Sequence, residues 1–384
     1  MRFAPRNPGA IRHAALLAAG LALLASGCKT TPTVPAQAPR PDPVGLFRVE
    51  PLTEGVYAVI RQDPPGLMVD ANNGFILGPD SVIVVDANGA PSLSRAVQQS
   101  LRTLTDRPVR QLVNTHWHDD HITGNAAWLE ANPGVEIVGH AANRDYLEGP
   151  GAGNRAAFVK DAAAFMPELE QLLANGKSLA GGPLSMEERA AIESDLALAG
   201  LVLREATPAP PVLPTVAVTK ALTIATGDRL VEVRSLGGGH TTGDLIVHLP
   251  RERIVFAGDL VVWPVPLIGA EQSSIEGWIV ALEALVALDP AIIVPGHGPV
   301  LRDTAYVEQL LTLLRTLRDG ANAAVARGDS LDATRQSIAL GDLRRSFAGD
   351  SPMRAILFDN YVAGPGVAAA YREARARAAP PRAE

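Results

Sequence analysis

The sequence predicts a mixed α/β protein, and three observations support that prediction. Short runs of β-branched residues alternate along the chain with stretches whose apolar residues recur at helical spacing. The run at 81–86 (SVIVVD) contains an unbroken β-branched stretch, as expected for a strand buried on both faces of a sheet. Hydrophobic residues make up 47% of the 384 residues and charged residues 20%, so the chain can bury a sizeable core.

The first half of the folded chain, from residue 46, is expected to be rich in strands. Glycine, proline and asparagine separate the apolar runs, as they do between short strands. We predict helices at 92–104 and 125–130, and strands at 47–49, 56–60, 74–77, 81–86, 109–113 and 135–138. Residues 144–203 differ, because apolar positions there recur at helical spacing on both sides of a glycine-rich turn. We expect an inserted helical hairpin in this segment.

The second half is expected to return to strands after a proline-rich link at 208–214. We predict one helix at 275–288 and strands at 216–224, 230–235, 245–249, 254–257 and 291–294. The strand-rich domain would then span 46–300. Residues 301–379 are predicted to be helical and to pack on that domain, with a break around 341–352 where glycine and proline occur.

The N-terminus is predicted to be a targeting segment. Three arginines precede an apolar run at 14–25 that is too short to span a bilayer comfortably. The run leads into Ala-Ser-Gly-Cys at 25–28, which resembles a bacterial lipobox with Ala25 where leucine is usual. We expect a signal peptide at 1–27, lipidation of Cys28, a proline-rich tether at 28–45, and a protein anchored by lipid in the periplasm. An ordinary secretory signal, and hence a soluble periplasmic or secreted protein, is the alternative.

Charge and cysteine content exclude several kinds of site. The formal net charge is −7 and aromatic residues are only 4%, which disfavours a nucleic-acid partner, since phosphate backbones demand clustered basic residues. Cys28 is the only cysteine. Intramolecular disulfides and cysteine-ligated metal sites are therefore excluded.

The segment 116–121 (HWHDDH) concentrates three of the eight histidines of the chain. It follows the predicted strand at 109–113, so its side chains would lie at a rigid sheet edge. Histidine nitrogen and carboxylate oxygen suit zinc and other borderline divalent ions. Three further candidate ligands adjoin predicted strands later in the chain, namely His240, Asp259 and His297.

Seven candidate ligands are enough for two metal ions. Side chains at positions i and i+2 point the same way, so His116 and His118 can share one ion, which His240 would complete. Asp120 and His121 would bind the second ion with His297, and Asp259 could bridge the two. Two zinc ions can hold a hydroxide between them and lower its pKa towards neutrality. Asp120 would also act in catalysis, by orienting this nucleophile and passing a proton to the leaving group.

The motifs H-x-H-x-D-H, Gly-Gly-His-Thr-x-Gly-Asp, Gly-Asp and Pro-Gly-His-Gly occur in this order between residues 46 and 300. In this respect the chain resembles the metallo-β-lactamase-fold hydrolase superfamily. The sequence around the later motifs is most similar to its periplasmic quinoprotein-associated and sulfur-oxidation-associated members. The resemblance implies an αβ/βα four-layer sandwich with the metal ions at one edge. It also implies that Asp86 braces the metal loop.

Departures from the zinc β-lactamases narrow the expected activity. Asp259 stands where some of those enzymes have a cysteine ligand, and Val262 stands where they have a substrate-binding lysine. Asp259 instead resembles the bridging aspartate of glyoxalase II-like and lactonase-like relatives. We therefore expect a hydrolase of an ester, thioester, lactone or amide bond in a small molecule. A β-lactamase and a non-catalytic metal-binding lipoprotein are the alternatives.

Residues beside the ligands are expected to shape the pocket. The apolar run at 261–268 suggests a hydrophobic part of the substrate, and Trp117 and Trp263 are candidate lining residues. Asp119 is expected to be exposed and structural. His140 and His248 are expected to lie outside the site. The oligomeric state is left open.

Overall fold

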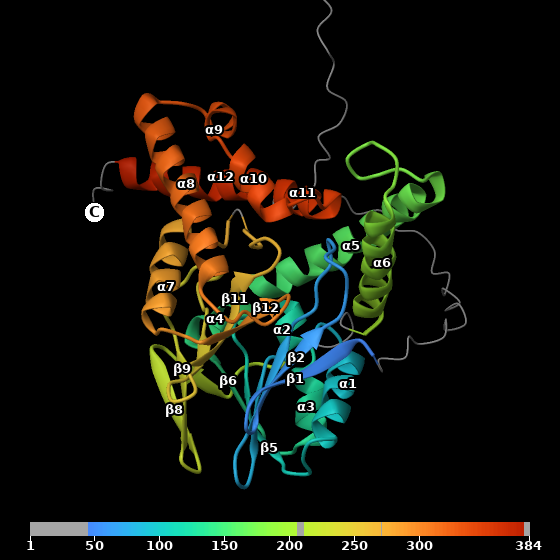
Figure 1. Cartoon of the computed structure of the whole chain (residues 1–384), viewed down its shortest axis with the longest axis vertical. Coiled ribbons are helices and arrows are strands. Elements are labelled where there is room, and N and C mark those ends of the chain that lie inside the picture. Colours follow the sequence, from blue (N-terminus) through green and yellow to red (C-terminus); the bar gives the residue numbers. More distant parts are fainter. Residues whose placement is uncertain (1–44, 206–210, 270, 380–384) are drawn as a thin grey trace, which may run out of the picture.

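The computed structural model describes residues 45–205, 211–269 and 271–379. Two β-sheets face each other, and helices cover their outer faces (Figure 1). Apolar side chains from both sheets form one shared core between them, with Val85 and Val113 from the first sheet against Val247 and Phe256 from the second. This arrangement confirms the predicted αβ/βα sandwich.

The first sheet has the strand order β1-β2-β3-β4-β5-β6-β7. Its first four strands pair antiparallel, whereas β4 to β7 run parallel. The carboxyl ends of the parallel strands therefore meet at one edge of the sheet. The strands are β1 (Phe47–Thr53), β2 (Val56–Arg61), β3 (Asn73–Leu77), β4 (Val82–Val85), β5 (Val109–Val113), β6 (Glu136–His140) and β7 (Val216–Val218).

The second sheet has the strand order β12-β11-β10-β9-β8. Only β11 and β12 pair in parallel. The strands are β8 (Ala221–Thr226), β9 (Arg229–Arg234), β10 (Ile246–Leu249), β11 (Ile254–Val262) and β12 (Ile292–His297). The single strand predicted at 216–224 is wrong, because β7 pairs with β6 in the first sheet and β8 pairs with β9 in the second. Residue alternation marks a strand but does not say which sheet it joins.

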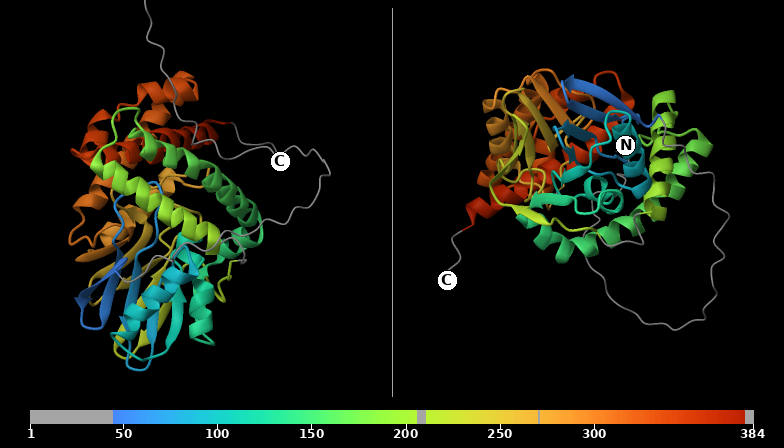
Figure 2. Two further views of the ribbon diagram at one scale, coloured as in Figure 1. Left: turned by 90° about the vertical axis from the view of Figure 1, so that its right-hand side faces the viewer. Right: turned by 90° about the horizontal axis from the view of Figure 1, so that it is seen from below.

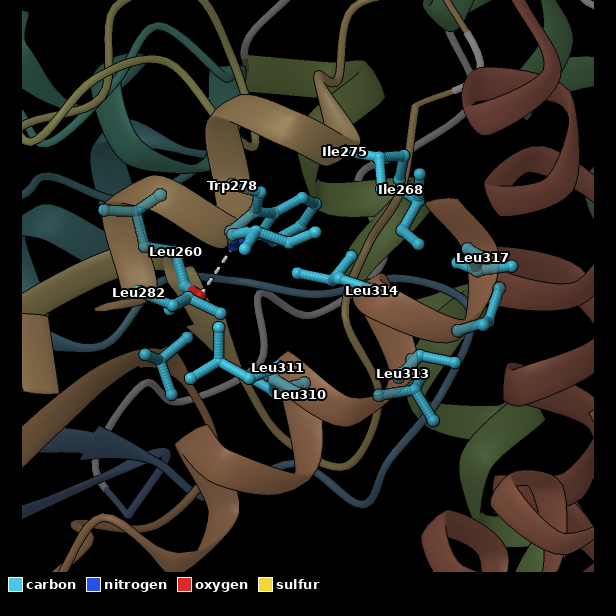
Figure 3. Packing of buried hydrophobic residues seen from close by; sticks show 14 of the residues in the cluster. Leu260, Ile268, Ile275, Trp278, Leu282, Leu310, Leu311, Leu313, Leu314 and Leu317 are labelled. Carbon is cyan, nitrogen blue, oxygen red and sulfur yellow. Dashed lines mark hydrogen bonds between the residues drawn. The ribbon is translucent and has the colours of Figure 1, made fainter. Parts of the chain in front are cut away.

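Helices complete the outer layers. On the first sheet, α1 (Pro91–Arg102) and α3 (Asn125–Ala131) bury Val97, Leu101 and Trp128. On the second sheet, α7 (Ile275–Ala287) and α8 (Ala305–Arg327) contribute to the largest apolar cluster of the described residues, part of which Figure 3 shows. Strand β11 and the C-terminal helices supply most of the rest of that cluster. In that cluster the indole nitrogen of Trp278 donates a hydrogen bond of 2.9 Å to the carbonyl oxygen of Leu260. The bond satisfies a polar group that burial would otherwise leave unpaired.

The segment inserted after β6 contains three helices, one more than the predicted hairpin. They are α4 (Ala141–Glu148), α5 (Pro150–Asn175) and α6 (Met186–Glu205). Figure 2 shows α5 and α6 side by side along one side of the molecule. Gly176 ends α5 in the left-handed conformation, which glycine adopts without steric cost.

The C-terminal region continues from α8 into α9 (Leu331–Ser337), α10 (Gly341–Ala348), α11 (Pro352–Phe358), the π-helical turn η1 (Asp359–Ala363) and α12 (Gly364–Ala378). The break predicted around 341–352 is wrong for most of its length. Pro352 occupies the first turn of α11, and Ser351 caps that helix by accepting a hydrogen bond from the Arg354 amide. Gly341 and Pro352 begin helices here, and the helical structure breaks only at 349–351, where Gly349 ends α10 with φ of 56°. Among the helices of the described residues, none is both long and apolar enough to cross a membrane.

Candidate metal centre

The histidine-rich segment starts at the carboxyl end of β5 and continues into the one-turn helix α2 (Asp119–Ile122). The buried side chain of Asn114 holds the two ends of the segment together. Its amide nitrogen lies 3.2 Å from the carbonyl oxygen of His121 and 3.0 Å from the side-chain oxygen of Asn125. The sheet edge therefore presents the histidines from a fixed backbone.

Asp86 has the contacts that a bracing residue needs. It follows β4 in the left-handed conformation, with φ of 58°. Its carboxylate accepts hydrogen bonds from the amide and the hydroxyl of Thr115, at 2.7 and 2.8 Å. The same carboxylate lies 2.9 Å from Nδ1 of His121. A histidine whose Nδ1 is held in this way presents its Nε2 atom for coordination.

The structure gathers the seven candidate ligands into two groups. His116, His118, His240 and Asp259 form the first ligand group, and Asp120, His121 and His297 form the second ligand group. Within each group the ligand atoms lie within 4.8 Å of one another. The sequence predicts the same two groups, with Asp259 as a bridge between them and not as a member of the first.

In the first ligand group, three ring nitrogens converge. Nδ1 of His118 lies 3.0 Å from Nε2 of His116 and 2.8 Å from Nε2 of His240. In the second ligand group, Nε2 of His121 lies 3.3 Å from Nε2 of His297. One oxygen of Asp120 lies 3.2 Å from Nε2 of His297.

Asp259 lies between the two groups at the bend of β11. Its Oδ2 atom is 3.4 Å from Nε2 of His240, and its Oδ1 atom is 3.2 Å from Nε2 of His121. One carboxylate oxygen thus faces each group. One glycine makes room for this carboxylate, because a Cβ atom at Gly296 would lie 1.9 Å from Oδ1 of Asp259. Gly258, the residue before Asp259, makes room for Thr115, because a Cβ atom there would lie 2.6 Å from the Thr115 side chain.

The packing of these side chains fits divalent cations. Nδ1 of His297 donates to the carbonyl oxygen of Asp70 at 3.0 Å, and Nδ1 of His121 faces Asp86. The two Nε2 atoms, 3.3 Å apart, therefore turn lone pairs towards each other, which is unfavourable unless a cation lies among them. Buried carboxylate oxygens of Asp120 and Asp259 accept no hydrogen bond from any residue that the structure describes.

The pKa shifts of the first group agree with this fit. Burial lowers the pKa of His240 to about 3, and the neighbouring His118 ring adds to the effect. Burial likewise lowers the pKa of His116 well below its usual range. Both rings are therefore neutral, as coordination requires. Burial tends to raise the pKa of Asp259, but the adjacent histidines lower it well below its usual range, so this carboxylate is charged.

The carboxylates in and around the second ligand group favour a positive charge between them. Burial tends to lower the pKa of His297, yet the carboxylates of Asp259 and Asp120 outweigh it and raise that pKa to about 10. Burial also tends to lower the pKa of His121, while Asp120 and Asp86 raise it well above its usual range. The positive charge that these carboxylates require can come from a proton or from a divalent cation.

A cavity of about 320 Å³ opens beside the ligands and is lined by His118 and Asp120. Trp117 lines it and stacks on Tyr146 of α4, with ring centroids 3.8 Å apart. Sequence reasoning missed its other walls, which come from segments without any motif. The missed residues are Leu67, Met68, Val69, Gly89, Tyr146, Leu147, Gly151, Arg155, Val202, Pro211, Gln272 and Tyr361.

The apolar run at 261–268 lies elsewhere. Val261 and Val265 are buried in the core, and Trp263 lines a second, smaller cavity of about 70 Å³ beside His297. The guanidinium carbon of Arg354 lies 4.4 Å from the centroid of the Trp263 ring. This run therefore does not form the wall of the larger cavity. It begins at the end of β11, and Val262, Pro264, Val265 and Leu267 line the smaller cavity together with Trp263.

Four other residues that the sequence singled out lie outside the two ligand groups or outside the described residues. Asp119 is only partly exposed, contrary to expectation, because it lines the larger cavity and lies 3.7 Å from the Arg155 guanidinium. His140 caps α4 by accepting a hydrogen bond from the Ala142 amide. His248 lies 3.2 Å from Glu232 on the neighbouring strand. The prediction for Cys28 falls outside the described residues.

The part of the chain that contains these ligands matches a known protein family. The model of the metallo-beta-lactamase superfamily matches residues 68–297, more than half of the chain. The chain belongs to the metallo-beta-lactamase superfamily. The matched range contains all seven candidate ligands, and it also contains the inserted helices.

Relatives in this superfamily are distant. A linear primary-alkylsulfatase from a Pseudomonas species is 24% identical over 246 residues, which is 63% of this chain and 44% of the relative. The thioesterase pkgB of Emericella nidulans is 26% identical over 151 residues, which is 36% of this chain and 44% of the relative. The chain therefore spans less than half the length of these curated relatives. A solved metallo-beta-lactamase from Pontibacter korlensis has a TM-score of 0.47 and 20% identity, and covers 70% of this chain and 99% of its own.

Proposed function

We propose that this protein is a zinc-dependent hydrolase that cleaves an ester, thioester, lactone or amide bond of a small substrate. One observation carries the proposal: Asp259 turns one oxygen to each of two adjacent groups of histidine and aspartate ligands. A shared carboxylate between two such groups suits a pair of zinc ions. Two bound ions would lower the pKa of a water molecule and polarise the bond under attack.

The chain supplies the remaining requirements of hydrolysis. Asp120 belongs to the second ligand group and also lines the larger cavity, so it faces the ligands and the substrate together. The histidines lower its pKa well below the usual range against the effect of burial, so it is charged and can accept hydrogen bonds from a water molecule. We assign Asp120 the orientation of the attacking water and the transfer of a proton to the leaving group.

Metal analysis tests the two-metal part of the proposal. We expect the purified protein to bind about two zinc ions per chain, and His118→Ala to lose turnover together with metal from the first ligand group. Asp259→Ala should lower the metal content as well. A protein that holds one ion, whose binding Asp259→Ala leaves unchanged, would contradict the proposal.

A substrate panel tests the reaction. The names of the two curated relatives add an acyl thioester and a primary alkyl sulfate to the aryl ester, lactone and amide that the site suggests. Hydrolysis of the thioester or the carboxylic ester supports the proposal. Preference for the alkyl sulfate would move the assignment to sulfate-ester hydrolysis, and rapid opening of nitrocefin would move it to a β-lactamase. No turnover with both metals bound would leave a non-catalytic metal-binding lipoprotein.

We also propose that the mature protein begins at Cys28 and is anchored by lipid in the periplasm. The lipobox-like sequence before Cys28 supports this proposal, and the proline-rich tether at 28–45 would hold the folded part away from the membrane. Mass spectrometry of the protein purified from membranes should find a diacylated or triacylated Cys28. A mature chain that begins elsewhere and carries no lipid would remove the anchor.

A further inference from the structure

We propose that the larger cavity binds an unbranched apolar chain of medium length, which is the acyl or alkyl part of the substrate. This inference rests on the proposed hydrolase function and names its substrate class. The cavity has a volume of about 320 Å³ and lies between the metal loop and the inserted helices. It is lined on the ligand side by His118 and Asp120, and on the other sides by Leu67, Met68, Tyr146, Leu147, Val202 and Tyr361.

Polar groups of the cavity gather around the metal loop. Gln272 lies 3.4 Å from Nε2 of His118, so its amide belongs to the ligand side. The guanidinium of Arg155 lies 3.7 Å from the carboxylate of Asp119, within the same loop. The lining contributed by α4 and α6 is mostly aliphatic or aromatic carbon, from Leu147, Val202 and the stacked ring of Tyr146.

This distribution orients the substrate. The polar and metal-binding groups that a scissile bond needs lie at the metal loop. The rest of the cavity is apolar surface, whose exposure to water is unfavourable. The cavity offers less positive charge to a bulky anionic substrate, because the nearby guanidinium of Arg155 already faces the carboxylate of Asp119. A substrate with an apolar chain attached to the scissile group matches both parts of the cavity, because its polar end meets the metal loop and its chain meets the apolar surface.

The size of the cavity sets the chain length. At about 30 Å³ for each water-sized unit, a volume of 320 Å³ holds roughly ten non-hydrogen atoms. A chain of about eight to ten carbons therefore fills it, and a chain of about sixteen exceeds it. Each methylene buried in such a cavity strengthens binding about fourfold.

The wall at Leu67 and Met68 is held in place, so the cavity exists before substrate arrives. The carboxylate of Asp195 on α6 accepts hydrogen bonds of 2.9 Å from the amides of both residues. The hydroxyl of Tyr361 in η1 donates to the carbonyl oxygen of Leu67 at 2.5 Å. Gly66 permits the approach of α6, because a Cβ atom there would lie 2.2 Å from the Asp195 carboxylate. A preformed cavity discriminates by length, since a longer chain does not enlarge it.

Chain-length dependence of hydrolysis is the first test. Zinc-loaded full-length protein is assayed with p-nitrophenyl esters of linear acids of two to sixteen carbons. We expect kcat/KM to rise about fourfold per methylene up to about eight to ten carbons and to fall beyond that. Leu147→Trp should shift the optimum to shorter chains. The control, Val280→Trp, places the same side chain at an exposed site on α7 outside the cavity and should leave the profile unchanged.

A binding measurement separates this inference from the proposed function. The melting temperature of the zinc-loaded protein is measured with 1-decanol and with 1-butanol, and only 1-decanol should raise it. Leu147→Trp should abolish the rise while keeping its zinc, and Val280→Trp should keep both. Binding of 1-decanol without turnover of any ester, thioester, lactone or amide would support the cavity and overturn the hydrolase. Ester turnover with a flat length profile and no decanol binding would support the hydrolase and overturn the cavity assignment.

Discussion

The two sides of the larger cavity hold their residues in different ways. On the ligand side, short loops at strand ends carry the side chains, and the buried carboxylate of Asp86 holds Thr115 and His121 in place. On the substrate side, helices far apart in the sequence meet at one loop, and Asp195 and Tyr361 hold that loop through its backbone. The ligand side contains the motifs that resemble the superfamily, whereas the substrate side is built from elements outside those motifs.

The largest expected effect comes from breaking the ligand side at its shared carboxylate. Asp259→Asn keeps the volume of the side chain but replaces one oxygen with an amide nitrogen that cannot bind a cation. We expect kcat/KM to fall by more than about 100-fold, beyond the usual cost of losing a group that only orients a ligand. Metal analysis should show fewer than two ions. Asp80→Asn, at an exposed site, is the control and should retain full activity.

A smaller loss should follow from weakening a brace instead of a ligand. In Asp86→Asn, an amide nitrogen replaces one of the oxygens that face Thr115 and His121. Metal affinity should decrease roughly 10- to 100-fold, which competition with a chelator of known affinity measures. Unchanged affinity would show that Asp86 supports only the backbone of the loop.

The substrate side offers a test by pH. Burial raises the pKa of Asp195 from 3.8 to about 6, although the Leu67 and Met68 amides oppose this shift. The folded protein therefore keeps a proton on Asp195 between about pH 4 and pH 6, where the unfolded chain has lost it. The stability contributed by this group is present at low pH and is lost as pH rises through about 6, by about 3 kcal/mol in all.

Asp195→Asn should remove that pH dependence. Free energies of unfolding, measured with denaturant at pH 4 and pH 7 in chelator, are compared for the parent and the variant. The parent should lose about 2 kcal/mol more than the variant between the two pH values, because the unfolded chain has already lost part of this proton at pH 4. Equal changes in the two proteins would show that Asp195 titrates in the same way folded and unfolded.

The smallest expected effect comes from Tyr361→Phe, which removes one hydrogen bond from the wall. The Leu67 carbonyl loses its donor, so stability should decrease by about 1 kcal/mol. Zinc content should stay at the parent value, because Tyr361 contacts no ligand through this bond. KM for a medium-chain ester should rise more than kcat falls. Loss of zinc in this variant would show that the two sides of the cavity are not independent.

The ligand side could be predicted from local sequence. His116, His118, Asp120 and His121 lie within one short segment, and the other ligands follow or precede apolar runs that identify strands. Strand ends in a sandwich meet at one edge, so positions along the chain translate into positions in space. The pairing of β7 with the first sheet and of β8 with the second shows where such reasoning stops, because strand partners are long-range choices.

By itself, the sequence predicted the mixed α/β class and the seven candidate ligands, since metal ligands need particular atoms at particular spacings. The αβ/βα sandwich was implied by the resemblance of its motifs to a known superfamily. Only the tertiary structure decided what faces those ligands across the cavity. Leu147, Val202 and Tyr361 follow the same helical pattern as ordinary core residues, and nothing in that pattern distinguishes a cavity wall from a packed interior. A cavity is the space that helices leave when they pack, and that space depends on every contact around it.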